Sequence, residues 1–173
     1  MNLLHDIGPG TKEKMNVIIE IPRGSQNKYE IDKKTGLIKL DRVLHTAQTY
    51  PFDYGFVPQT LWDDRDALDV VLLTTVPLFP GVLVHARPVA ILPMVDGGEA
   101  DEKVIAVPAD DPRFAHIKDL PDLNAHTLKE IAHFFVTYKK LQNKEVSVGE
   151  YGGRADAEAA FERAGKMYSN GKK

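Results

Sequence analysis

The sequence predicts an α+β fold that is mainly β, with the strands first and the helices last. Short runs of β-type residues, separated by turn signals, fill most of the 173 residues. Many short strands at roughly even spacing are typical of a sandwich or a small barrel. The C-terminal third changes to the three- and four-residue spacing of helices, which favours segregated strands and helices over alternating ones.

Each expected strand is an apolar or alternating run between turns. Strands are expected at residues 17–21, 28–31, 37–43, 70–74, 82–94 and 104–107, with an ordered extended segment at 50–58. The alternation at 28–31 places Lys28 and Glu30 on one strand face. Pro88 is expected to break the run at 82–94, because proline has no N–H to donate to a neighbouring strand.

Two helices are expected in the last third of the chain. Between residues 124 and 141, apolar residues recur at three- and four-residue steps, namely Leu128, Ile131, Ala132, Phe135 and Tyr138. This spacing is that of an amphipathic helix. A second helix is expected at 156–168, which is rich in Ala and Glu.

The composition is that of an ordinary globular protein and excludes several kinds of chemistry. Hydrophobic residues make up 43% and charged residues 27%, so residues 1–173 are expected to form a single domain with a real core. The formal net charge of −3 gives no general attraction to nucleic acid or to a membrane surface. No apolar run is long enough to span a membrane. The absence of cysteine excludes disulfides, thiolate metal ligands and cysteine nucleophiles, and it fits a cytoplasmic location.

The most informative segment runs from Asp64 to Asp69 and leads straight into an apolar run at 70–73. Asp64, Asp66 and Asp69 place three carboxylates within six residues, and Asp69 stands where the apolar strand should already have begun. A buried carboxylate is costly unless it is paired or bound to a metal. Mg²⁺ and Mn²⁺ prefer such hard oxygen ligands. A polar turn before the strand would explain the same residues without a metal.

Charged residues recur within or at the ends of the expected strands. If they converge, one site would hold seven carboxylates and four cations, namely Glu20, Glu30, Asp64, Asp66, Asp69, Asp96 and Asp101 with Lys28, Arg42, Lys103 and Lys139. Divalent cations would reverse the negative charge and allow phosphate groups to bind. Tyr50, Tyr54 and Tyr138 would then donate hydrogen bonds to phosphate oxygens. Alternatively, the charges lie on exposed strand faces and the tyrosines in the core, and periodicity does not decide between the two.

The order and spacing of several short motifs carry more information than any of them alone. The motifs are Glu20-Ile21-Pro22, Lys28-Tyr29-Glu30, Leu40-Asp41-Arg42, Tyr50 to Pro58, Asp64 to Val70, Ala86-Arg87-Pro88, Asp96 to Lys103, Val104 to Pro108 and Ile131 to Lys139. This ordered set resembles the family I soluble inorganic pyrophosphatases of the prokaryotic type. The resemblance covers most of the chain, from Ile18 to Lys139.

The resemblance implies Mg²⁺-dependent hydrolysis of inorganic pyrophosphate to two phosphates by direct attack of a metal-bridged hydroxide. It implies a five-stranded closed barrel of the oligonucleotide-binding (OB) type, flanked by two C-terminal helices. Mn²⁺ or another divalent cation is expected to be able to substitute for Mg²⁺. Short-chain members of the family are commonly hexamers, so a homohexamer is expected as well.

The resemblance also implies a role for each candidate residue by its position. Asp66 matches the general base. The expected metal ligands are Asp64, Asp69, Asp101, Asp96 and Glu20. The substrate-binding positions are matched by Lys28, Arg42, Tyr54, Lys103, Tyr138 and Lys139. Glu30 and Tyr50 match supporting positions.

The chain departs from the family pattern beside the first aspartates. The family has a small residue and a proline where this chain has Arg65 and Ala67. Ala67 lacks the preset backbone angle of proline. Arg65 either points to solvent or pairs with one of the aspartates in competition with metal.

Three other interpretations compete with pyrophosphate hydrolysis. The same barrel could bind phosphate groups or nucleic acid without turnover, but the charge of −3 and the lack of a basic stripe with interleaved aromatics argue against this. A phosphatase of the haloacid-dehalogenase type would place its aspartate pair after an apolar strand, whereas Asp64 follows Leu61-Trp62-Asp63. A calcium loop beginning at Asp64 would need Gly and Glu where the chain has Asp69 and Thr75.

Overall fold

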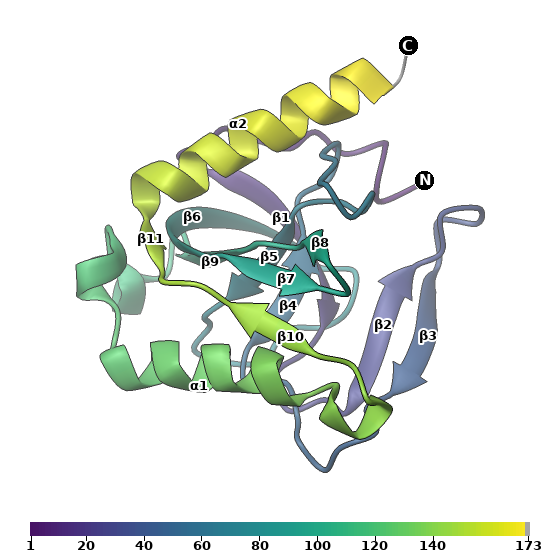
Figure 1. Ribbon diagram of the computed structural model, residues 1–173. Coiled ribbons are helices and arrows are strands. Elements are labelled where there is room, and N and C mark those ends of the chain that lie inside the picture. Colours follow the sequence, from purple (N-terminus) through teal and green to yellow (C-terminus); the bar gives the residue numbers. More distant parts are fainter. Residues whose placement is uncertain (172–173) are drawn as a thin grey trace.

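Five strands close into a barrel at the centre of the protein (Figure 1). The computed structural model describes residues 1–171. The barrel strands, in spatial order, are β1 (Met15–Ile21), β4 (Asp53–Phe56), β5 (Asp69–Leu72), β9 (Lys103–Pro108) and β6 (Leu83–Leu92). The ring closes because β6 also pairs with β1. The β5–β9 pair is parallel and the other pairs are antiparallel. Because every one of the five strands is paired on both sides, the predicted five-stranded closed barrel is confirmed.

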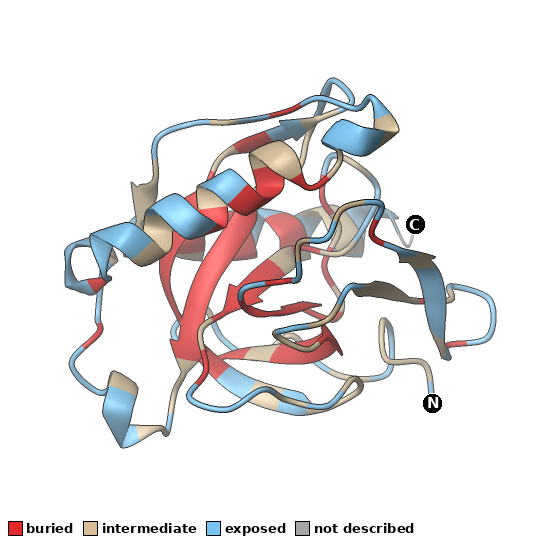
Figure 2. Ribbon diagram, turned by 90° about the horizontal axis from the view of Figure 1, so that it is seen from below, coloured by how far each residue is buried: buried red, intermediate tan, exposed pale blue. Residues whose placement is uncertain are grey.

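Most of the barrel is buried on both faces, which explains the continuous apolar runs in its strands. All four residues of β4 are buried, as are the first five of the six in β9. One side of the barrel packs against an aromatic cluster that includes Tyr50, Phe52, Phe134 and Phe135. The opposite side packs against the C-terminal helix. Figure 2 shows the strands in red between helices whose outer faces are exposed.

The two predicted helices are present and cover the barrel on different sides. Helix α1 (Ala125–Thr137) begins after Asn124, whose side chain caps the first turn by accepting from two backbone N–H groups. Helix α2 (Arg154–Gly171) buries a stripe made of Ala157, Ala160, Phe161 and Ala164. Both match the predicted segments with small shifts at their ends. No helix within residues 1–171 has the length and apolar character needed to cross a bilayer.

The remaining elements lie outside the barrel. Strands β2 (Asn27–Ile31) and β3 (Ile38–Val43) form a hairpin that projects from the barrel in Figure 1. Strands β7 (Met94–Asp96), β8 (Glu99–Ala100) and β10 (Val146–Val148) form a small second sheet, and β11 (Gly152–Gly153) pairs with β6. Three short 3₁₀ helices are η1 (Pro112–Phe114), η2 (Leu120–Asp122) and η3 (Lys140–Gln142).

The expectation that Pro88 breaks its strand was wrong. Strand β6 runs through Pro88 without interruption, and its pairing with β9 shifts register between Pro88 and Ala90. A register shift of this kind leaves one residue outside the regular ladder, so the missing N–H of proline costs little there. The run after β6 continues as β7, which the sequence did not separate from it.

Gly55 is the position in the barrel where a side chain is least tolerable. A Cβ built on Gly55 would lie 2.0 Å from the carbonyl oxygen of Ile18 on the paired strand β1. We therefore expect Gly55→Ala to lower the free energy of unfolding by about 3 kcal/mol or more, because β1 and β4 must separate. Urea unfolding measures the change.

Gly165→Ala is the matched control for this substitution. A Cβ at Gly165 in helix α2 would meet nothing within 4 Å. We expect this change to raise the free energy of unfolding by about 0.5–1 kcal/mol, since alanine loses less backbone entropy than glycine on folding. Equal effects of the two substitutions would contradict the argument.

Candidate active site

Three carboxylates meet at one end of the β5–β9 pair. One oxygen each of Asp64, Asp69 and Asp101 lies within 4.8 Å of the others. Asp69 opens β5, Asp64 lies in the turn before it, and Asp101 lies just before β9. The parallel register sets Asp69 opposite Lys103, which brings the two segments together. Three hard oxygen donors at this spacing suit a divalent cation such as Mg²⁺.

Lys103 partly neutralises this carboxylate cluster. Its side chain is 2% exposed, and its Nζ donates to Asp69 Oδ2 at 2.6 Å and to Asp101. Burial alone would lower the pKa of Lys103, but the attraction of Asp69 and Asp101 outweighs burial and raises it. Lys103 therefore remains a fixed positive charge among the carboxylates.

Three carboxyl groups of the site, those of Asp101, Asp64 and Glu20, hold protons more strongly than ordinary carboxyl groups. Burial raises the pKa of Asp101 to about 7, and the neighbouring Asp69 adds to the effect. Burial also raises the pKa of Asp64, which is hydrogen-bonded to Asp101. Glu20 of β1 is buried, and burial together with Asp69 raises its pKa to about 8. A divalent cation would replace these protons, since it binds the ionised form.

A tight turn presents Asp64 and Asp66. Trp62 N donates to Asp66 O at 2.7 Å, and Arg65 N donates to Trp62 O at 3.0 Å. Asp66 N donates to Asp64 Oδ1 at 3.0 Å, which orients the Asp64 carboxylate. Arg65 has a φ of 68°, in the left-handed region that favours glycine. This explains why a small residue suits the position.

The Arg65 side chain does not compete for the carboxylates. The residue is exposed, and its guanidinium makes no ion pair with any residue from 1 to 171. Of the two alternatives that the sequence left open, the structure shows the one in which Arg65 points to solvent. The metal-binding geometry is therefore not blocked by this departure from the family pattern.

Asp66 lies outside the three-carboxylate cluster but in the adjoining cleft. The cleft has a volume of about 110 Å³, and both Asp66 and Asp69 line it, together with Lys28, Glu30 and Tyr54. The Asp66 side chain is 58% exposed, and its Oδ1 lies 2.5 Å from Nζ of Lys33. Asp69 thus belongs to both the cluster and the cleft.

The β2–β3 hairpin supplies two cations to the same region. Lys28 and Arg42 are cross-strand neighbours. Lys28 donates to Glu30 and lies 3.7 Å from Asp41, and Arg42 Nη1 donates to Asp41 at 2.6 Å. Arg42 Nε is buried and has no hydrogen-bond partner among the described residues. A buried donor without a partner is costly, which makes Arg42 a candidate for binding an anion.

Tyr138 and Lys139 directly follow helix α1 and contribute a hydroxyl and a cation to the site. Lys139 donates to Asp96 of β7. Burial lowers the pKa of Lys139, and Arg42 and Lys28 add to this although Asp96 opposes it. Burial raises the pKa of Tyr138, and the nearby Asp96 and Asp101 raise it further. These interactions require the hairpin, the cluster and the end of α1 to lie close together.

Tyr54 and Tyr50 complete the site from the buried side. Both side chains are almost fully buried, and burial raises the pKa of each well above its usual value. The Tyr54 hydroxyl is hydrogen-bonded to Asp69. The structure thus brings together all the site residues that the sequence predicted, from Glu20 to Lys139.

Sequence reasoning missed Lys33 and Asp41. Lys33 lies in the turn of the β2–β3 hairpin and reaches Asp66 across 33 residues of sequence. Asp41 pairs with both hairpin cations. Asp41 lies in the motif Leu40-Asp41-Arg42, and this position could have identified it as a site residue. For Lys33 no such signal exists, because periodicity does not indicate where the tip of a hairpin folds.

The comparison with known proteins decides the family. The family model described as inorganic pyrophosphatase matches residues 17–169. This chain belongs to the inorganic pyrophosphatase family. Hydrolysis of inorganic pyrophosphate is therefore its activity, and the predicted family and enzyme class are confirmed.

Individual relatives agree with this assignment. The chain is 47% identical over 163 residues to a soluble inorganic pyrophosphatase of Oryza sativa subsp. indica, covering 94% of this chain and 76% of the relative. It is 46% identical to soluble inorganic pyrophosphatase 1 of Arabidopsis thaliana, covering 95% and 77%. The crystal structure of inorganic pyrophosphatase from Thermus thermophilus superposes with a TM-score of 0.93 at 45% identity, covering 98% of this chain and 99% of that one. The structure of inorganic pyrophosphatase from Helicobacter pylori superposes with a TM-score of 0.91 at 43% identity, covering 95% of this chain and 99% of that one.

The raised pKa of Glu20 predicts how the metal-free pyrophosphatase responds to pH. Because the folded-state pKa of about 8 exceeds the ordinary value of 4.5, protonated Glu20 favours the folded state, and this stability is lost as the pH rises through 8. Glu20→Gln removes the charge and can still accept the hydrogen bond that Ile31 N donates at 2.9 Å. We expect Glu20→Gln to be about as stable as the parent at pH 5 and more stable by about 1–3 kcal/mol at pH 9.

Urea unfolding with a chelator at both pH values measures this difference at one fixed protein concentration. A stability difference that is the same at pH 5 and pH 9 would show that Glu20 does not titrate in this range.

Proposed function

We propose that this pyrophosphatase uses Mg²⁺ to split pyrophosphate into two phosphates and that Asp66 is its general base. The observation that carries the proposal is the position of Asp69. It belongs to the three-carboxylate cluster and also lines the cleft that contains Asp66 and Lys28. The carboxylates that would bind metal, the proposed base and a cation that would bind phosphate thus adjoin one another.

The carboxylates fit a divalent cation through their chemistry. Asp64, Asp69 and Asp101 would hold the first Mg²⁺, and Glu20 and Asp96 would support further ions that arrive with the substrate. Bound Mg²⁺ would neutralise phosphate charge and lower the pKa of a water molecule. Mn²⁺ or another divalent cation would suit the same all-oxygen donor set.

The cations of the site would bind the phosphate oxygens. Lys28, Arg42 and Lys139 come from different elements, and each is paired with a carboxylate, namely Glu30, Asp41 and Asp96 respectively. Pyrophosphate oxygens would compete for these cations and satisfy the buried Nε of Arg42. Lys103 would contribute its fixed positive charge.

The tyrosines would act as hydrogen-bond donors. Both hydroxyls are protonated near neutral pH, as ordinary tyrosines are, and burial raises the pKa of Tyr54 and of Tyr138 further. A protonated hydroxyl donates to a phosphate oxygen without adding negative charge. Tyr50 and Glu30 would support this arrangement, Tyr50 by packing against Tyr54 and Glu30 by holding Lys28.

Asp66 would accept the proton of the attacking water. Its carboxylate is solvent-accessible and lines the cleft, so a water molecule can reach it. The ion pair with Lys33 keeps one oxygen of Asp66 oriented. No covalent intermediate is required, which agrees with the absence of cysteine.

The assignment of Asp66 is tested by Asp66→Asn. We expect rapid phosphate release from pyrophosphate by the parent with Mg²⁺, none with a chelator, and at least a hundredfold slower release by Asp66→Asn, because the amide does not accept the proton. Asp110→Asn is the matched control, since Asp110 is also exposed and paired with a lysine, Lys14, at 3.1 Å. It should leave the rate unchanged.

The same assay separates hydrolysis from the alternative of a binding barrel without turnover. A folded parent that releases no phosphate above background would favour the binding barrel and would remove the basis for assigning Asp66.

We also propose that the chain assembles as a homohexamer in the cytoplasm. Three large apolar side chains close in sequence, Val76, Phe79 and Leu83, are exposed in the single chain, and Phe79 is 81% exposed. Contact with further copies would cover them. Light scattering should give six times the mass of one chain, and the mass of a monomer would contradict the proposal.

A further inference from the structure

Four side chains beside the carboxylate cluster have no part in the function proposed above. Trp62 and Asp63 directly precede Asp64 in sequence, and Glu102 directly follows Asp101. Arg163 lies on helix α2. Together these four residues are called the α2 bridge below.

The first contact of the α2 bridge joins the two segments that carry the carboxylates. Trp62 Nε1 donates a hydrogen bond to Glu102. Trp62 is 5% exposed and is packed in the core cluster that includes Phe161 and Ala164 of α2. The hydrogen bond therefore ties the turn before β5 to the segment before β9 from a buried, well-packed anchor.

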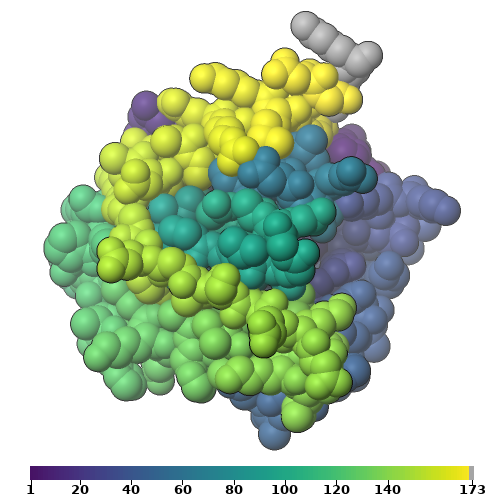
Figure 3. Space-filling view, viewed as in Figure 1, coloured from purple at the N-terminus to yellow at the C-terminus, as the bar shows by residue number. Residues whose placement is uncertain are grey.

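The second set of contacts joins the turn to α2. Arg163 donates to both oxygens of Asp63, at 2.6 and 2.8 Å, and its guanidinium lies 4.4 Å from the centre of the Trp62 ring. Leu61 N donates to Ala164 O at 3.1 Å. Figure 3 shows α2, in yellow, lying along blue and teal parts of the chain that belong to these segments. The helix thus holds three successive residues of the turn.

Fixing this turn matters because the carboxylates repel one another. Asp64 and Asp101 lie in different segments, and when both are ionised, as cation binding requires, their like charges favour separation. Trp62 closes the turn through backbone hydrogen bonds to residues 65 and 66, so a shift of Trp62 would move Asp64 relative to Asp101. Residues that orient metal ligands typically change metal affinity by 10–100-fold when they are replaced.

We propose that the α2 bridge consists of positioning residues that hold Asp64 and Asp101 at metal-binding distance, so that helix α2 sets the affinity for Mg²⁺. The proposal rests on the Mg²⁺ site proposed above and adds to it residues that make no contact with metal or substrate. It gives the C-terminal helix a role in metal binding in addition to its role in the core.

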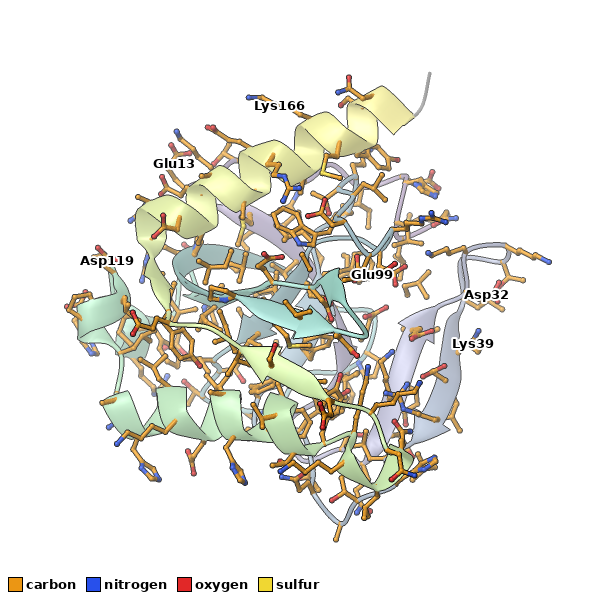
Figure 4. All side chains as sticks on the ribbon, viewed as in Figure 1. Glu13, Asp32, Lys39, Glu99, Asp119 and Lys166 are labelled. Atoms are coloured by element: carbon orange, nitrogen blue, oxygen red, sulfur yellow. The ribbon has the colours of Figure 1, made fainter. Side chains whose placement is uncertain are left out.

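Arg163→Met is a sharp test, because a positioning role and a simple charge effect predict opposite changes in the affinity for Mg²⁺. Removing the cation that neutralises Asp63, the residue next to Asp64, would strengthen Mg²⁺ binding by charge alone. The α2 bridge predicts about tenfold weaker binding. Lys166→Met is the matched control, because it removes a positive charge from the exposed side of the same helix (Figure 4) and should not weaken binding.

Two substitutions of Glu102 separate its hydrogen bond from its charge. Glu102→Gln removes the charge but keeps an acceptor for Trp62 Nε1, whereas Glu102→Ala removes both. The α2 bridge predicts an affinity near that of the parent for Glu102→Gln and about tenfold weaker binding for Glu102→Ala. Glu99→Ala removes an exposed carboxylate from the nearby strand β8 and should bind like the parent (Figure 4).

Mg²⁺ affinity is measured by isothermal titration calorimetry on the whole chain without substrate, so the readout does not depend on activity. Circular dichroism establishes that each variant is folded, and the Glu102 pair decides the question if Arg163→Met does not fold. The proposal would be overturned if Arg163→Met bound Mg²⁺ as tightly as the parent or more tightly. It would also be overturned if Glu102→Gln and Glu102→Ala lost the same amount of Mg²⁺ affinity. A parent that binds no Mg²⁺ would overturn the metal site itself, and this result is distinct because it is seen before any variant is compared.

Discussion

Mutual repulsion among three carboxylates is the constraint on which the rest of the site depends. Asp64, Asp69 and Asp101 are held within 4.8 Å of one another, although ionised groups at that distance favour separation. Buried Lys103 offsets part of this repulsion, and the raised pKa of Asp101 shows that protonation relieves it as well. Burial of apolar residues in the barrel offsets the rest of the repulsion. The β5–β9 register that brings the carboxylates together is also the one that buries the apolar residues at 70–72 and 104–107.

Around this cluster, the protein neutralises its own cations when no substrate is bound. Lys28, Arg42 and Lys139 each have a carboxylate partner, and Lys33 pairs with Asp66. These four cations are therefore neutralised within the protein, while the site as a whole keeps more carboxylates than cations. Under the function proposed above, metal and substrate would exchange these internal pairs for pairs with ligands. The gain in charge–charge attraction would then be smaller than the number of cations suggests.

Local pattern predicted the elements of this fold well and their contacts poorly. The helix expected between 124 and 141 and the strands expected at 70–74 and 104–107 followed from spacing and apolar content, and the structure has them at 125–137, 69–72 and 103–108. The run from Asp64 to Asp69 was recognisable because carboxylates stood where a buried strand begins. Whether Glu20, Asp101 and Lys139 would meet could not be derived from periodicity, since barrel closure is a non-local event, and it came from the family resemblance. Lys33 and the hydrogen bond between Trp62 and Glu102 were missed for the same reason, because each depends on where a turn or loop folds over residues distant in sequence.

The parallel pairing of β5 with β9 also determines when the site can exist during folding. Thirty residues separate the end of β5 from the start of β9, and β6, β7 and β8 all lie in that interval. A parallel pair therefore forms only after a long crossover has been ordered, which makes it an intrinsically slow step. No fragment that ends before residue 103 contains the complete carboxylate cluster with its lysine, so a nascent chain on the ribosome cannot form the intact site until most of the barrel has been synthesised.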